Sequence, residues 1–124
     1  MLITQDEEDA SQFALVRFLS DGSLDKSFGT NGYVIFTNDD DENNKYAQAV
    51  LVDEENRIII AGTEDSKFAL YRFLEDGMLD DDFNGGTPFE DGVDSGNAIA
   101  RDFLDRFVVV GSKDLTTFLV ARYT

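Results

Sequence analysis

The sequence predicts an all-β fold in which tandem four-stranded antiparallel blades form an incomplete β-propeller. Three observations lead to this prediction. A strand-like segment, Phe-Ala-Leu-x-Arg-Phe, occupies residues 13–18 and 68–73 and returns in weaker form at 118–123. Short apolar runs alternate with polar turns, and no segment has the apolar spacing of a helix. Four-stranded units repeated roughly every 50 residues are typical of propeller blades. A β-sandwich and a short β-solenoid are the alternatives.

Each repeat unit is expected to contain four short strands. Tight polar links join the first two strands, as in a hairpin, and the third is the repeated Phe-Ala-Leu segment, whose two apolar faces are both expected to be covered. The fourth strand of the second unit contains Pro88, which cannot donate to a sheet ladder and therefore predicts an edge strand. The expected strands are residues 47–53, 57–63, 68–73 and 87–90, with counterparts at 97–103, 106–112, 118–123, 13–18 and 33–37.

The predicted blade boundaries divide the chain into unequal parts. We expect an acidic N-terminal segment with a strand stub at 1–12, strands three and four of a first blade at 13–45, a full second blade at 46–95 and three strands of a third at 96–124. A propeller closes with about four blades or more. We therefore expect either neighbouring blades in a longer chain or a homo-oligomer, with pairing at the open strand 118–123, because exposed sheet edges recruit other strands.

The repeated pattern resembles the delta-60 repeat family. The matching motifs are Phe-Ala-Leu-x-Arg-Phe, then Asp-Gly-Ser-Leu-Asp with Phe28, then Ala-Val-Leu-Val-Asp ending at Asp53, then Arg-Ile-Ile-Ile-Ala-Gly ending at Gly62. The resemblance covers nearly all of residues 13–124, and the second copy departs from the pattern at 83–88. It implies propeller-like blades in a secreted or surface-exposed bacterial protein, and it supplies no catalytic residues.

Composition disfavours several classes of function. The net charge of −16 repels phosphate backbones and anionic lipid heads, so neither nucleic-acid binding nor binding to a membrane surface is expected. Cysteine and histidine are absent, which leaves no disulfide, no thiolate metal site and no Ser-His-Asp triad. No apolar stretch is long enough for membrane insertion. The first eight residues have no basic region and so predict no signal peptide.

Three arginines share one position of the repeat: Arg17, Arg72 and Arg122. A ring of anion-binding guanidinium groups is one interpretation. We favour the other, in which Arg17 pairs with Asp25 and Arg72 with Asp80, because an arginine buried without a partner in an apolar strand would be costly. These residues are therefore predicted to be structural repeat positions.

Two acidic clusters are weak candidates for a calcium site: Asp39, Asp40 and Asp41 in one loop, and Asp80, Asp81 and Asp82 in another. Calcium binds six to eight oxygen atoms, which such loops can supply. Neither cluster has the spacing of an EF-hand, and we expect solvated loops and no cofactor.

The sequence therefore predicts a non-catalytic structural or interaction module, self-associating or part of a larger bacterial surface or secreted protein, with a protein or glycan ligand. A carbohydrate-binding, lectin-like module with sites between blades is the alternative. A hydrolase that uses paired carboxylates is the weaker alternative, because no pair of acids is marked by its position.

Overall fold

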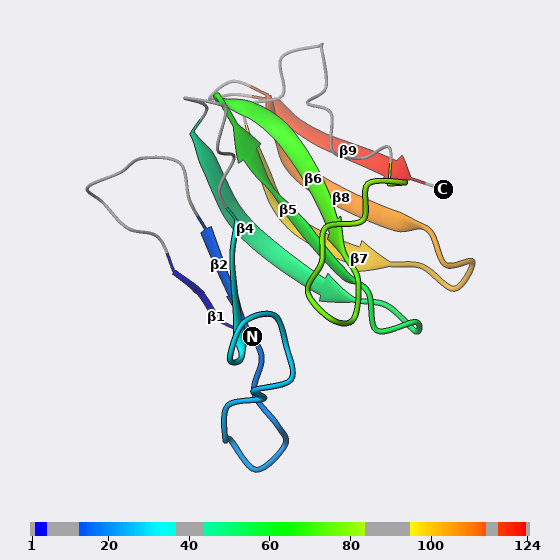
Figure 1. The fold of residues 1–124 in the computed structure, drawn as a ribbon. Helices are drawn as coiled ribbons and strands as arrows, with labels where there is room; N and C mark the ends of the chain where they lie inside the picture. The colour runs from blue at the N-terminus through cyan, green and yellow to red at the C-terminus, as the bar shows by residue number, and fades with distance from the viewer. Residues whose placement is uncertain (1, 5–12, 37–43, 84–94, 114–116, 124) are drawn as a thin grey trace.

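The computed structural model describes residues 2–4, 13–36, 44–83, 95–113 and 117–123. The regular secondary-structure elements in these ranges are all β-strands. These strands form three antiparallel sheets that stack side by side in chain order (Figure 1). The first sheet contains β1 (Leu2–Thr4), β2 (Phe13–Val16) and β3 (Tyr33–Phe36); the second contains β4 (Lys45–Val52), β5 (Ile58–Glu64) and β6 (Lys67–Phe73); the third contains β7 (Ser95–Arg101), β8 (Phe107–Lys113) and β9 (Thr117–Tyr123).

The predicted fold class is confirmed, and the strands lie within about two residues of their expected bounds. Each sheet is a simple meander in which consecutive strands are neighbours. β1 pairs with β2, at the place that a second strand takes in the other sheets. The expected fourth strand of the second unit, at 87–90, lies outside the described residues. Over the described ranges the sheets do not close into a ring, and no helix there is long and apolar enough to span a membrane.

A repeated glycine is explained by a repeated bulge. β4 and β7 each contain a register shift at the matching place along the strand. The bulge moves the carbonyl oxygen of Tyr46 against Gly62 on β5, and that of Ser95 against Gly111 on β8. A Cβ at either glycine would overlap that oxygen, so the repeat can place only glycine there.

The two faces of each sheet have different neighbours. We call the face that carries Phe13, Phe68 or Phe118 the leading face of its sheet, and the opposite face the trailing face. In the stack, each leading face packs against the trailing face of the next sheet. The second sheet is therefore covered on both sides, and β5 is buried along its whole length.

Apolar side chains fill both junctions between sheets. At the first, the Phe13 ring lies edge-on to Phe73, with ring centroids 6.3 Å apart. At the second, Phe68 stacks on Tyr123, also at 6.3 Å. The buried residues of the first junction are Phe13, Leu15, Phe28, Ile58, Ile60, Ala69, Tyr71 and Phe73, and those of the second are Ile59, Ala61, Phe68, Leu70, Phe107 and Val109.

Candidate interaction surface

The arginines of the repeat belong to turn clusters that follow the third strand of each unit. Arg17 donates from Nε to Oδ2 of Asp25 at 2.7 Å. Its guanidinium carbon lies 4.6 Å from the centre of the Phe28 ring. A salt bridge on one edge and an aromatic ring on one face together fix the planar group.

The second copy of the cluster has the same geometry. Arg72 donates to Asp80 at 2.7 Å and lies 4.4 Å from the centre of the Phe83 ring. The structure thus contains both pairings that the repeat predicts. Arg122, at the third position, is exposed on β9 and forms no ion pair with the described residues. Arg17 and Arg72 therefore support their turns, because each guanidinium group is already paired with an aspartate.

Arg17 also links two sheets. Its Nη1 donates to the carbonyl oxygen of Glu75, in the turn that follows β6, at 2.6 Å. The backbone N–H of Gly29 donates to the carbonyl oxygen of Asp76 in the same turn, at 2.9 Å. Arg17 therefore stabilises both its own turn and the contact with the neighbouring sheet.

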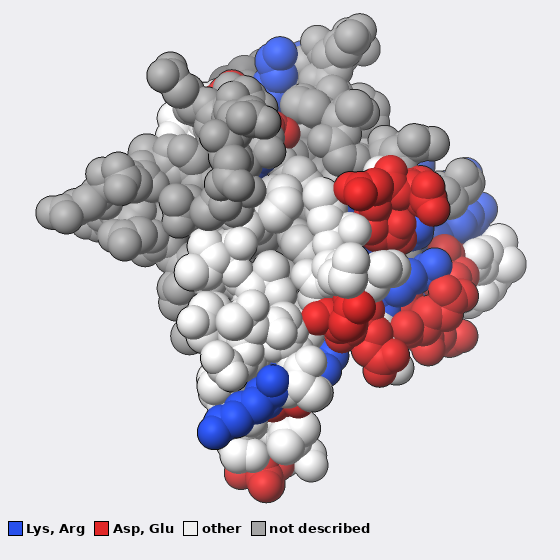
Figure 2. Space-filling model, viewed as in Figure 1, with Lys and Arg blue, Asp and Glu red and all other residues white. Residues whose placement is uncertain are grey.

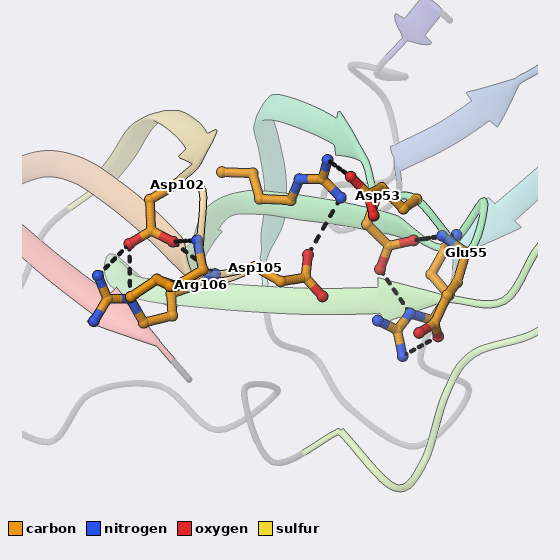
Figure 3. Close-up of polar contacts among 9 residues, drawn as sticks. Asp53, Glu55, Asp102, Asp105 and Arg106 are labelled. Atoms are coloured by element: carbon orange, nitrogen blue, oxygen red, sulfur yellow. Dashed lines mark hydrogen bonds and ion pairs between the residues drawn. The ribbon is translucent and has the colours of Figure 1, made fainter.

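A second repeated pair supports the hairpin between the first and second strands of a unit. In the second sheet, Oδ1 of Asp53 accepts hydrogen bonds from the backbone N–H groups of Glu55 and Arg57, both at 2.9 Å. Oδ2 accepts one from Nε of Arg57 at 2.6 Å (Figure 3). Burial raises the pKa of Asp53, but the hydrogen bonds from Arg57 and Glu55 and the charge of Arg57 together leave the pKa below its ordinary value.

The third sheet repeats this hairpin with Asp102 and Arg106 (Figure 3). Asp102 accepts from the N–H groups of Leu104 and Arg106 at 2.8 and 3.1 Å, and from Nε of Arg106 at 2.7 Å. The hydrogen bond from the Arg106 side chain is the main cause that lowers the pKa of Asp102 from 3.8 to about 2. Sequence reasoning missed this pair, although an aspartate four residues before an arginine at both hairpins was a signal.

The hairpins of neighbouring sheets are also joined to each other. Nη2 of Arg101 at the end of β7 lies 2.8 Å from Oε1 of Glu54, in the β4–β5 hairpin. Nη1 of the same arginine lies 3.2 Å from Oδ1 of Asp105 in its own hairpin. Figure 2 shows the acidic residues gathered on one side of the view, where Figure 1 places these hairpins.

A buried charged group lies at the start of the second sheet. The Nζ atom of Lys45 is 2.9 Å from Oε1 of Glu64, and the hydroxyl of Tyr71 donates to Oε2 of Glu64 at 2.8 Å. The lysine is 2% exposed. These residues line a cavity of about 220 Å³ together with Phe36, Arg72, Leu79, Asp80, Asp81 and Phe83. The lining contains three acidic and two basic side chains, so it does not favour an anion.

The proposed calcium ligands fall into two groups. Asp39, Asp40 and Asp41 lie outside the described residues. Asp80 already accepts hydrogen bonds from Arg72 and from the backbone N–H of Asp82. Among the residues that the structure describes, no group of three or more acidic side chains is arranged to hold a metal ion.

The leading face of the third sheet is more exposed than the leading face of the second sheet. Phe118 on β9 is 79% exposed, whereas Phe68, at the same position of the repeat, is 2% exposed. Val120 is 57% exposed and its counterpart Leu70 is fully buried. The expectation that both faces of this strand are covered is therefore wrong for β9 within the described residues.

Comparison with known proteins supports the fold. Residues 4–28 and 56–83 match the model of a family described as a domain of unknown function (DUF5122), β-propeller. Both matched segments end at the aromatic residue of a turn cluster, Phe28 or Phe83. No curated protein and no solved structure matches the chain. The match and the three sheets agree on an incomplete β-propeller.

Proposed function

We propose that this chain is a non-catalytic interaction module that binds another protein through the leading face of its third sheet, and that its repeats are of the delta-60 type. The exposure of Phe118 carries this proposal, because the side chains at the same position in the first and second sheets are both 2% exposed. A contiguous exposed apolar patch on a soluble protein commonly marks a site where another protein binds.

The polar groups of the repeat support a structural role. Arg17 and Arg72 are engaged by Asp25 and Asp80, and Arg57 and Arg106 by the hairpin aspartates. Groups that are held in pairs within turns support the fold and leave binding to the apolar face. The resemblance to delta-60 repeats supports a place in a larger bacterial surface or secreted protein.

The proposal is tested by replacing a residue on the leading face. The purified chain is immobilised, and the protein that it retains is measured from a solution of the same chain and, separately, from a bacterial host extract. Val120→Glu places a charge in the middle of the apolar patch and should abolish specific retention. Phe103→Glu is the matched control, because Phe103 is 93% exposed in the β7–β8 turn. Equal retention by the parent chain and the Val120→Glu variant would contradict the proposal.

A further inference from the structure

We infer that the partner of this leading face is a second copy of the chain, which presents the trailing face of its first sheet. This inference rests on the proposed function, because it names the partner of the same surface. It commits the surface to a head-to-tail contact between copies.

Both halves of such a contact are exposed in one chain. Among the side chains whose burial is described, the trailing face of the first sheet exposes Phe18 at 47%, Tyr33 at 41% and Ile35 at 55%. Ile35 pairs with Ala14 across the strands and Tyr33 with Val16, so these residues share one face. The third sheet exposes Phe118, Val120 and Val110 on its leading face. One apolar face of each kind is therefore left open.

The two internal junctions show how such faces fit together. In both, an aromatic residue of a leading face lies 6.3 Å from an aromatic residue of the next trailing face, Phe13 with Phe73 and Phe68 with Tyr123. In the repeat, Phe18 is the counterpart of Phe73 and Tyr123. The same contact between copies would bring Phe118 of one copy against Phe18 of the other.

The polar contact of the first junction also has a counterpart. There, Arg17 donates to the carbonyl oxygen of Glu75. Arg122 is the third member of the arginine series, and Ser20 holds the position in the first unit that Glu75 holds in the second. Arg122 of one copy would donate to the carbonyl oxygen of Ser20 in the second copy, so the contact would satisfy an exposed arginine as well as the apolar face.

Closure limits the size of the assembly. Head-to-tail contacts between identical chains form rings when the rotation closes. The described residues of each chain form three sheets, so two copies supply six, within the range of about four to eight blades that propellers have. The net charge of −16 opposes association, and because salt screens this repulsion the dimer should be more stable at higher ionic strength.

The test is the solution mass of the whole chain by light scattering, at low and high salt. We expect the parent to have twice the 13.8 kDa mass of one chain. Phe118→Glu damages only the leading face and Ile35→Glu only the trailing face, and each variant alone should be monomeric. A mixture of the two should form a 1:1 dimer, because one of its two contacts is intact. Phe103→Glu should be dimeric like the parent.

Each result has a defined meaning. A parent that is monomeric at both salt concentrations overturns the inference, as does a mass that grows with concentration beyond two copies. An Ile35→Glu variant that still forms a dimer would show contact between two leading faces and would also overturn it. Circular dichroism checks that the variants are folded. If the parent is monomeric but retention in the host extract still depends on Val120, the proposed function stands and only the choice of partner fails.

Discussion

The ring of Phe68 on β6 occupies the space beside Gly96 on β7, so closely that a Cβ on the glycine would overlap two of the ring atoms. This contact joins the leading face of the second sheet to the trailing face of the third. The corresponding position in the second sheet is Ala47, which packs against the core cluster that contains Phe13. The third sheet therefore packs against its neighbour more closely at this point than the second sheet does.

We expect Gly96→Ala to destabilise the chain by about 1–3 kcal/mol, the usual cost of overpacking a filled junction. The added methyl group must displace Phe68, which is buried and has little space to move. Urea denaturation followed by circular dichroism measures the change in the free energy of unfolding. In the Gly96→Ala background, Phe68→Leu removes the clashing ring atoms and should cost less than it does in the parent. Additive costs for the two substitutions would argue against the overlap.

The pairing of Arg72 with Asp80 predicts that arginine cannot be replaced by lysine at this position without a loss of stability. Lysine keeps the charge but loses the Nε–Oδ2 hydrogen bond and the flat contact with the Phe83 ring. We expect Arg72→Lys to lower the free energy of unfolding by about 1.5–3 kcal/mol, the range for a hydrogen bond to a charged group. Lys67→Gln, an exposed change on the same strand, should have almost no effect. A melting temperature equal to that of the parent would contradict the structural role of Arg72.

Asp102 predicts a dependence of stability on acid pH. Its pKa is about 2 in the folded chain against an ordinary value of 3.8. The carboxylate therefore contributes stability above pH 3.8, and this contribution is lost as the pH falls towards 2. Asp102→Asn removes the group, so the parent should be more stable than the variant at neutral pH, and the difference should shrink as the pH falls through this window. Because both proteins share all other acids, the comparison isolates this group. A difference in stability between the parent and the variant that does not change with pH would contradict the lowered pKa of Asp102.

The parts of the fold that could be predicted are those whose sequence recurs along the chain. The segment that contains Arg17 and Phe18 recurs nearly unchanged, so its strand, its turn and the partner of its arginine could all be predicted from the spacing. Asp53 and Arg57 recur as well, but a short polar link is so common in hairpins that their hydrogen bonds were not expected. Repetition identifies equivalent positions, and it leaves their contacts to be worked out from chemistry.

The open face could not be predicted in the same way. Phe118 holds the same position of the repeat as Phe68, and periodicity assigns both to covered faces. Whether a face is covered depends on whether another sheet packs against it. The sequence of a single strand does not contain this information. The burial of Lys45 was also missed, because a lysine at the start of a strand ordinarily points to solvent. Pairing of β4 with β5 places Glu64 opposite Lys45, and Tyr71 on β6 donates to that same glutamate.

The buried pair of Lys45 and Glu64 leads to the last prediction. Removing one partner of a buried ion pair leaves an uncompensated charge and typically costs about 3–5 kcal/mol. Lys45→Met should therefore be strongly destabilising, because it removes the ammonium group that lies 2.9 Å from the almost fully buried Glu64 carboxylate.

The matched variant removes the second charge as well. Adding Glu64→Gln to Lys45→Met should restore part of the lost stability, because the neutral amide oxygen can still accept from the Tyr71 hydroxyl. The free energies of unfolding of the parent, the two single variants and the double variant form a double-mutant cycle, which gives the coupling between the two charges. We expect a coupling energy of at least about 1 kcal/mol. A double variant whose cost equals the sum of the single costs would mean that Lys45 and Glu64 do not stabilise each other.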